Sequence, residues 1–352
     1  MKVSDIGEQG LLKILQRFCP PDIIGDDAAV LKTDPEQSLV VTTDVLVDNI
    51  HFSEITTSPE DVGWRAAAAN LSDIAAMGAL PLGITVGLGL PGDALVSWVE
   101  RLYQGMTECL LPYDTPIVGG DIVRSPIITL SITAFGQVYP HRTIYRHTAQ
   151  VGNVIVATGV HGASRAGLEL LLHPESASNL ISESDKQALI TAHQRPQPRL
   201  DVLPLLWQIL NSSPFLTSST LNKGRGNPAP TNSPFPLSGM DSSDGLADAI
   251  LQICRASNVG AILEWQKIPK PKAFENWLTP AQALEYTLYG GEDFELILCL
   301  PNQFAQRVVQ QLGNNAAIIG KITSGLQVIL HDGNNKIPDQ VLTLNRGFQH
   351  FS

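Results

Sequence analysis

Cysteine is scarce in this sequence of 352 residues, which has four widely spaced copies, Cys19, Cys109, Cys254 and Cys299. No two of them form a C-x-x-C pair, so the spacing indicates neither a zinc ribbon nor a disulfide scaffold. Residues 1–10 mix acidic and basic side chains and no apolar run follows them, which is unlike a signal peptide. We therefore expect the chain to work in the reducing cytoplasm.

Positive charge is also in short supply, because 23 Lys and Arg residues stand against 34 Asp and Glu, a formal net charge of -11. Nucleic acids and anionic bilayers are held by a basic field, so we expect no nucleic-acid partner and no membrane partner. A nucleotide stays possible, since bound divalent metals can supply the missing positive charge. Charged residues at 16% and hydrophobic residues at 43% predict a globular chain.

One uncharged stretch, residues 74–92, reaches the length of a membrane span. It contains Pro81, Pro91 and five glycines, which break a continuous helix. We expect the end of a helix, a turn and a buried strand here, and no membrane segment.

The chain has no Walker P-loop, G-x-x-x-x-G-K-[ST], so an ATP site would need another architecture. Residues 87–92 do match G-x-G-x-x-G, the dinucleotide-binding pattern. However, Pro91 removes an amide from the tight turn, and Asp114 precedes the next predicted strand where the ribose-binding acid should end it. The dinucleotide site is the weaker interpretation of this segment.

Length and pattern predict two mixed α/β domains, because single cores stop growing beyond about 250 residues. A long alternating strand at 127–138 is followed by a polar, turn-like segment at 142–153 and a new strand at 154–158. We place the boundary in that polar segment, with an N-terminal domain of residues 1–148 and a C-terminal domain of residues 149–352.

Hydrophobic periodicity predicts the further elements. Helices are expected near 11–18, 59–78, 93–111, 182–193, 202–210 and 244–257, and strands near 28–31, 39–43, 82–90, 115–118 and 261–265. Residues 211–239 are rich in Ser, Pro, Asn, Thr and Gly, and we expect an irregular insertion there.

Acidic residues beside small residues recur in six segments: IGDDAAV, TTDVLVDNIHF, NLSDIAAMGA, VGGDIVRS, DSSDGL and YGGEDFEL. Carboxylates among apolar neighbours lose solvation and repel one another, so a cation should gather them. Magnesium fits best, since it takes carboxylate, hydroxyl and phosphate oxygens, whereas the chain has neither a twelve-residue calcium loop nor zinc-ligand spacing. Several magnesium ions around a polyphosphate would let an acidic protein hold ATP.

Each acid taken singly can instead be a helix N-cap or a turn residue, and we interpret Asp48, Asp61 and Asp93 in that way. The glycines in these segments either admit bound oxygens to backbone N–H groups or only make turns with positive φ. Those that precede acids are Gly25, Gly119, Gly120, Gly290 and Gly291. The recurrence as a group favours the phosphate interpretation.

The six segments in this order, with the turn near Arg146 and the closing RGFQHF, resemble the signature blocks of the thiamine-monophosphate kinase family from about residue 22 onward. The resemblance implies a two-domain architecture shared with the aminoimidazole ribonucleotide synthetase superfamily. It also implies a homodimer built on N-terminal domains, with ATP bound beside the interface. The chain lacks the Cys-and-Gly-rich N-terminal loop of the related selenophosphate synthetase.

The matching positions imply three groups of site residues. Magnesium ligands would be Asp27, Thr42, Thr43, Asp44, Asp73, Asp121, Asp241 and Asp244. ATP contacts would be Gly120, Asp121, Arg146, Ser243 and Tyr103. Substrate contacts would be His51, Glu292 and Phe348. An aromatic face and a carboxylate suit a thiazolium cation, although Phe348 alone could be core and His51 an ordinary loop histidine.

The resemblance implies direct in-line transfer of the ATP γ-phosphate to the phosphate of thiamine monophosphate, giving thiamine diphosphate. An acceptor phosphate is already an anionic nucleophile, so no residue is assigned as a general base. Two alternatives stay open: another ATP-using synthetase of the same superfamily, and a nucleotide-binding protein without catalysis.

Overall fold

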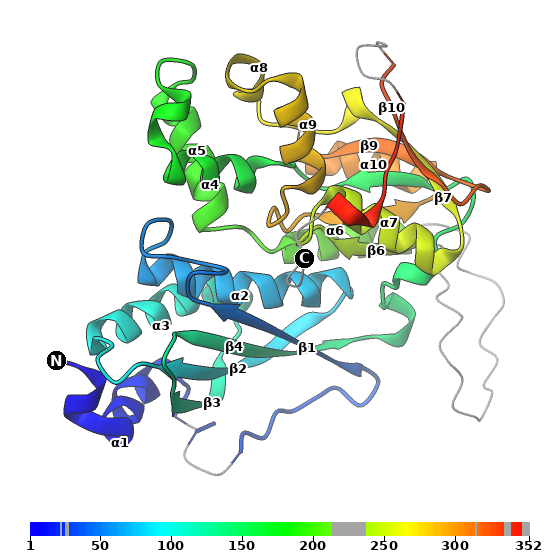
Figure 1. Ribbon diagram of the computed structural model, residues 1–352. Helices are drawn as coiled ribbons and strands as arrows, with labels where there is room; N and C mark the ends of the chain where they lie inside the picture. Colours follow the sequence, from blue (N-terminus) through cyan, green and yellow to red (C-terminus); the bar gives the residue numbers. More distant parts are fainter. Residues whose placement is uncertain (22, 25–27, 213–236, 314, 334–338, 347–352) are drawn as a thin grey trace.

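The computed structural model describes residues 1–21, 23–24, 28–212, 237–313, 315–333 and 339–346 of the chain. Two sheets, one in each half of the sequence, carry helices on their faces (Figure 1). The mixed α/β class predicted from the sequence is therefore confirmed.

The first sheet has the strand order β1-β4-β2-β3 within the described residues. Its strands are β1 (Ser38–Val47), β2 (Leu80–Leu90), β3 (Ile117–Arg124) and β4 (Thr129–Val138). Strand β4 pairs antiparallel with β1 and β2, while β2 and β3 run parallel. Alternate residues of β4 from Leu130 to Val138 are buried, which marks the face that packs against helices α2 (Pro59–Ala76) and α3 (Val96–Leu110) (Figure 1).

Helices α2 and α3 pack at unusually close range because each presents a glycine to the other. A Cβ at Gly63 would lie 1.9 Å from the Leu102 carbonyl oxygen, and one at Gly105 would lie 1.8 Å from the Glu60 carbonyl oxygen. Any side chain there would force the helices apart. Helix α2 begins at Pro59 after Ser58, whose hydroxyl accepts from the Asp61 N–H at 3.3 Å. The position of α2 on the sheet is thereby fixed.

The second sheet has the order β11-β10-β7-β9-β5-β8-β6. Its strands are β5 (Val154–Ala157), β6 (Ser238–Asp241), β7 (Gly260–Glu264), β8 (Leu296–Leu300), β9 (Ala317–Thr323), β10 (Val328–His331) and β11 (Gln340–Val341). The other helices are α1 (Val3–Leu15), α4 (Ala163–Leu172), α5 (Glu183–Gln194), α6 (Val202–Asn211), α7 (Leu246–Ser257), α8 (Phe274–Trp277), α9 (Pro280–Tyr289) and α10 (Asn302–Leu312).

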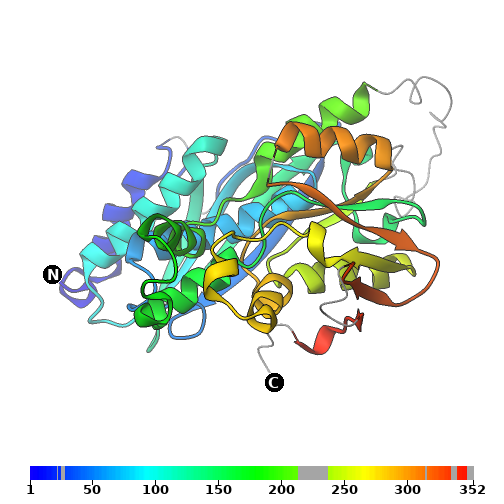
Figure 2. The ribbon, with the colours of Figure 1, turned by 90° about the horizontal axis from the view of Figure 1, so that it is seen from above.

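One hydrophobic core runs through both halves of the chain. Successive residues of β8 point to opposite faces, and Leu296, Leu298 and Leu300 join the same cluster as the interior of the first sheet and helices α2, α6 and α10. The opposite face, with Ile297 and Cys299, packs against α7 in a second cluster. Figure 2 shows α10 (orange) and α7 (yellow-green) on opposite sides of the second sheet. The shared core holds the two sheets in a fixed relation, which positions the groove between them.

Several sequence predictions need correction. Residues 28–31 form no strand, and β3 runs to Arg124, well past the predicted end of 115–118. Asp121 therefore lies within an edge strand and not in a loop after one. In the predicted insertion 211–239, Asn211 ends helix α6, and Ser238 and Gly239 begin β6, while 213–236 lie outside the described residues.

The uncharged stretch 74–92 forms the end of α2, a turn and strand β2, as predicted. Within the described ranges, no helix has both the length and the apolar character needed to cross a membrane.

Candidate active site

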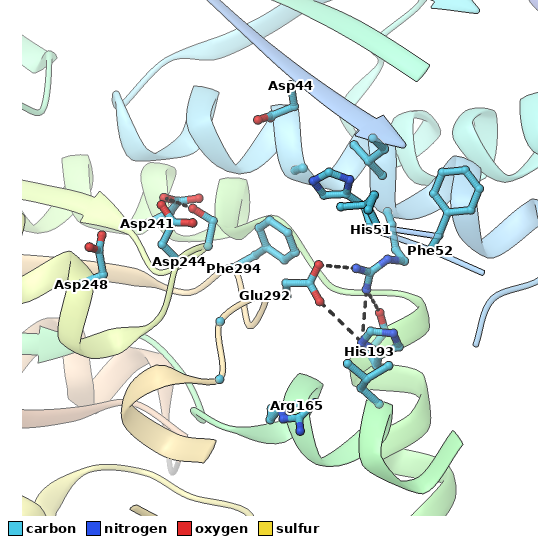
Figure 3. A pocket seen from close by; sticks show the side chains of 18 of the residues that line it. Asp44, His51, Phe52, Arg165, His193, Asp241, Asp244, Asp248, Glu292 and Phe294 are labelled. Carbon is cyan, nitrogen blue, oxygen red and sulfur yellow. Dashed lines mark hydrogen bonds and ion pairs between the residues drawn. The ribbon is translucent and has the colours of Figure 1, made fainter. Parts of the chain in front are cut away.

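A cleft of about 1160 Å³ lies between the two halves of the chain. The first half contributes β1 with the loop that follows it, residues 43–56, and part of α2. The second half contributes α4, the β6–α7 segment and the turn before β8, residues 289–294 (Figure 3). Residues from distant parts of the sequence thus face one another across the cleft.

Carboxylates from both halves gather at one end of the cleft: Asp44 on β1, Asp73 on α2, Asp241 at the end of β6 and Asp244 in the turn before α7. Burial, then Asp73 and Asp244, raise the pKa of Asp44 to about 6. Burial, followed by Asp73, raises the pKa of Asp241 to about 7, and burial raises that of Asp73. These acids are therefore crowded and poorly solvated.

Neighbouring hydroxyls hold two of these carboxylates in place. Ser72 of α2 donates to one Asp241 oxygen at 2.7 Å, and Ser243 donates to the other at 3.1 Å. The Thr42 hydroxyl donates to Asp73. The bond from Ser72 to Asp241 also ties α2 to β6, so the acidic end is a junction between the halves.

The side chains at this end of the cleft could hold a cation. Burial raises the pKa of Asp73 and of Asp248, and the charge of Arg146, at the cleft wall, opposes that rise only in part. Asp248, in the first turn of α7, also lines the cleft (Figure 3). One guanidinium cannot neutralise so many acids.

The donor set fits magnesium, which combines a few carboxylate or hydroxyl ligands with water and phosphate oxygens. In the part of the chain that the structure describes, no three His, Cys, Asp or Glu side chains converge tightly enough to hold an ion unaided. Asp44, Asp73, Asp241 and Asp244 would thus share an ion with water or phosphate. Asp27, the remaining predicted carboxylate ligand outside β3, lies outside the described residues.

The other end of the cleft holds His51 and Glu292. The Val47 N–H donates to Nδ1 of His51 at 3.1 Å, which leaves the proton of a neutral imidazole on Nε2. Glu292 Oε1 accepts from Nη2 of Arg65 at 2.5 Å, and its Oε2 lies 3.7 Å from Nδ1 of His193. Phe348, the third predicted substrate contact, lies outside the described residues.

The predicted nucleotide contacts are divided between two hollows. Arg146 and Ser243 line the cleft, whereas Tyr103, Gly120 and Asp121 line a second cavity of about 650 Å³ beside edge strand β3. Thr43 lines the cleft and hydrogen-bonds Thr133 at 2.9 Å. Within one chain, the site residues predicted from the family therefore do not form a single group.

Sequence analysis missed several residues of the cleft. Asp248 lies in the first turn of the helix that follows DSSDGL, and its closeness to that motif could have revealed it. Arg65 and His193 gave no local signal, because they meet Glu292 from segments far away in the sequence.

Replacing Asp44 by Asn is expected to stabilise the metal-free protein, because the change removes a carboxylate that burial and nearby acids disfavour. With its pKa at about 6, the folded chain binds a proton between about pH 4 and pH 6 that the unfolded chain has already released. Wild-type stability should fall as pH rises through that window, and that of Asp44→Asn should fall less. Thermal midpoints in EDTA should show a gain of a few degrees at about pH 8 and almost none at about pH 4.

The matched control is Asp48→Asn, in the same segment but outside the lining of the cleft. It should show no such pH-dependent gain. An Asp44→Asn protein less stable than wild type in EDTA at about pH 8 would contradict the repulsion inferred here.

Both halves of the chain match known proteins. Residues 25–138 match the family model "AIR synthase related protein, N-terminal domain", and residues 237–332 match the corresponding C-terminal domain. The thiamine-monophosphate kinase of Synechococcus elongatus is 50% identical over 350 residues, which cover 99% of this chain and 98% of that protein.

Two solved structures have the same fold over nearly the whole chain. The thiamine-monophosphate kinase from Stenotrophomonas maltophilia K279a matches with a TM-score of 0.74 and 29% identity, covering 92% of this chain and 95% of that one. AaThiL complexed with AMPPCP and TMP matches with a TM-score of 0.67 and 29% identity, covering 97% and 98%. The two halves, the cleft between them and the identity along the whole chain agree: this protein belongs to the thiamine-monophosphate kinase family.

Proposed function

We propose that this protein transfers the γ-phosphate of ATP to the phosphate of thiamine monophosphate (TMP), producing thiamine diphosphate and ADP. The observation that carries the proposal is the difference between the two ends of the cleft. Its acidic end suits a metal-bound triphosphate, and its other end presents a carboxylate and a histidine to a smaller partner. The relatives' names, and a structure of AaThiL with AMPPCP and TMP bound, support the same pairing of ligands.

On the nucleotide side, we assign the carboxylates of Asp44, Asp73, Asp241 and Asp244 to hold magnesium. The hydroxyl oxygens of Thr42 and Thr43, which lie beside them, would be further ligands. Bound magnesium would supply the charge neutralisation that a triphosphate needs in an acidic cleft. Arg146 and Ser243 would bind phosphate oxygens. Asp27 remains a proposed magnesium ligand, and Tyr103, Gly120 and Asp121 remain proposed nucleotide contacts, although within one chain those three line the second cavity.

On the acceptor side, His51 would donate from Nε2 to the phosphate of TMP, because its Nδ1 already accepts from the backbone. Glu292 would face the thiazolium cation, and Phe348 is proposed to pack against the ring. An oxygen of the TMP phosphate attacks the γ-phosphorus in line as the bond to the β-phosphate oxygen breaks. No proton needs to leave the nucleophile, so no residue acts as a general base.

We further propose a homodimer formed through the first sheet, within an N-terminal domain of residues 1–148 joined to a C-terminal domain of residues 149–352. Strand β1 is an edge strand, and its outer face exposes Leu39, Val41 and Val45 by about half or more. An open edge with apolar side chains is typical of an interaction surface. The cytoplasm is the proposed location, since four free cysteines suit a reducing compartment.

Thiamine diphosphate formation from TMP and ATP tests the activity directly. Product measured by chromatography should appear with magnesium and disappear in EDTA. Asp44→Asn should lose at least about 100-fold in rate, because the cation would lose a charged ligand, while Asp48→Asn should retain near wild-type activity.

The outcomes separate the alternatives. Folded protein that binds ATP with magnesium but forms no thiamine diphosphate would overturn the proposal. ATP consumption with another acceptor would indicate a synthetase of the same superfamily, and binding without any turnover would indicate a non-catalytic protein.

The dimer has its own test. Val41→Glu places a charge on the exposed face of β1 and should give a monomer by light scattering, because a buried unpaired charge is strongly disfavoured. Leu326→Glu, at a position more exposed than Val41 and in the other half of the chain, is the control and should leave the mass unchanged. A wild-type protein that is monomeric at micromolar concentration would contradict the dimer.

A further inference from the structure

Arg65 is a cation buried at the junction of the two halves. Its side chain is 3% exposed and extends from α2 into the acceptor end of the cleft. Nη2 donates to Glu292 Oε1 at 2.5 Å, and Nη1 donates to the carbonyl oxygen of His193. Its Nε has no hydrogen-bond partner among the described residues. A buried and incompletely paired guanidinium is costly for stability, which raises the question of what it does.

Glu292, the carboxylate that Arg65 binds, lies in a turn with an unusual backbone conformation. Glu292 has φ of 57°, Gly291 has 68° and Phe294 has 52°, so three residues of this short turn adopt the left-handed region that side chains rarely occupy. The Glu292 N–H donates to the Ser243 carbonyl at 2.7 Å. Asp293 accepts from the N–H groups of Gly162 and Ser164 at 2.7 and 2.9 Å. Surrounding contacts therefore impose this conformation, as is common where a side chain must be aimed.

His193 limits how Glu292 is neutralised. Its Nδ1 lies 3.2 Å from the Ser164 hydroxyl and 3.7 Å from Glu292 Oε2. Burial, followed by the charges of Arg65 and Arg165, lowers the pKa of His193 to about 2, so the imidazole is neutral. Arg65 thus binds one carboxylate oxygen while the other faces a neutral ring and the cleft, and the side chain of Glu292 remains 37% exposed.

Helix α2 makes a second contact of the same kind at the opposite end of the cleft. Ser72 follows Arg65 by seven residues, two helical turns, so both project from one side of the helix about 10 Å apart along its axis. Ser72 bonds Asp241 at the acidic end, and Arg65 bonds Glu292 at the acceptor end. A single rigid element therefore spaces the two ends.

Resting on the proposed function, we propose that Arg65 is a positioning residue for the acceptor. It holds the Glu292 carboxylate so that its other oxygen meets the cationic ring of the substrate. Through α2, it also fixes the distance between that ring and the acidic end where the γ-phosphate would lie. Arg65 touches neither substrate nor nucleotide in this account and acts through Glu292.

A purely structural ion pair is the competing explanation, and the chain supplies a matched control. Arg195 also joins the two halves, with Nε 2.8 Å from Asp61 and Nη1 2.9 Å from Glu108, but it lies outside the lining of the cleft. Loss of Arg195 should weaken the interface between the halves without disturbing Glu292.

The test compares Arg65→Gln, Arg65→Lys and Arg195→Gln by steady-state kinetics and thermal midpoints. Arg65→Gln should raise the KM for TMP by about 10-fold or more, the effect of losing one charged hydrogen bond, with the KM for ATP within about 2-fold. Arg65→Lys, which keeps the charge, should recover part of the loss, and it decides the matter if the Gln protein does not fold. Arg195→Gln should lower the thermal midpoint and leave both KM values within about 2-fold.

A double-mutant cycle gives a readout that a structural role would not move. Adding Glu292→Gln to Arg65→Gln should raise the KM for TMP by less than the product of the single effects, because both remove one interaction. Unchanged KM for TMP in Arg65→Gln, or equal rises in both KM values, would overturn the proposal.

Calorimetric binding of TMP to the same variants separates this proposal from the proposed activity. A wild-type protein that binds TMP but forms no thiamine diphosphate would contradict the kinase assignment alone, and weaker TMP binding in Arg65→Gln would still support Arg65. A wild-type protein that does not bind TMP would overturn both.

Discussion

Repulsion among buried carboxylates is the interaction on which the rest of this structure depends. Asp44, Asp73, Asp241 and Asp244 reach the same end of the cleft from β1, α2, β6 and the turn after it. Burial first, and then their mutual repulsion, disfavours the charged carboxylates, so the pKa values of Asp44 and Asp241 rise toward neutrality. The fold must hold these carboxylates together against that repulsion, and the shared hydrophobic core supplies the constraint.

Helix α2 positions several of the side chains that line the cleft. Its close contact with α3 at Gly63 and Gly105 leaves little freedom for it to shift. In this fixed position, α2 places Asp73 and Ser72 at the acidic end of the cleft and Arg65 at the end that holds Glu292.

Much of the fold followed from the sequence because its signals are local. Pro59 marked the start of α2, and the prolines and glycines of 74–92 marked a turn and a strand in place of a membrane span. One exception is β3, where Gly119, Gly120 and Asp121 have poor strand propensity. Pairing with β2 decides their conformation, and propensity cannot reveal pairing.

The site divides in the same way. The recurrence of acids beside small residues led to Asp44, Asp73, Asp241 and Asp244, and the structure brings these together. Arg65 could not be found, because a single Arg in an alanine-rich helix has no pattern until its partner at Glu292 is placed beside it. Likewise, the separation of Tyr103, Gly120 and Asp121 from the cleft depends on sheet geometry that no motif encodes.

The most direct measurement is the calorimetric affinity of the protein for ATP in excess magnesium and in EDTA, with Asp44→Asn alongside wild type. If carboxylate repulsion governs the site, wild type should bind at least about 100-fold more weakly in EDTA. The Asp44→Asn protein should then bind ATP more weakly than wild type in magnesium and more tightly than wild type in EDTA. Equal wild-type affinity in the two conditions, or an Asp44→Asn protein weakened equally in both, would contradict this account.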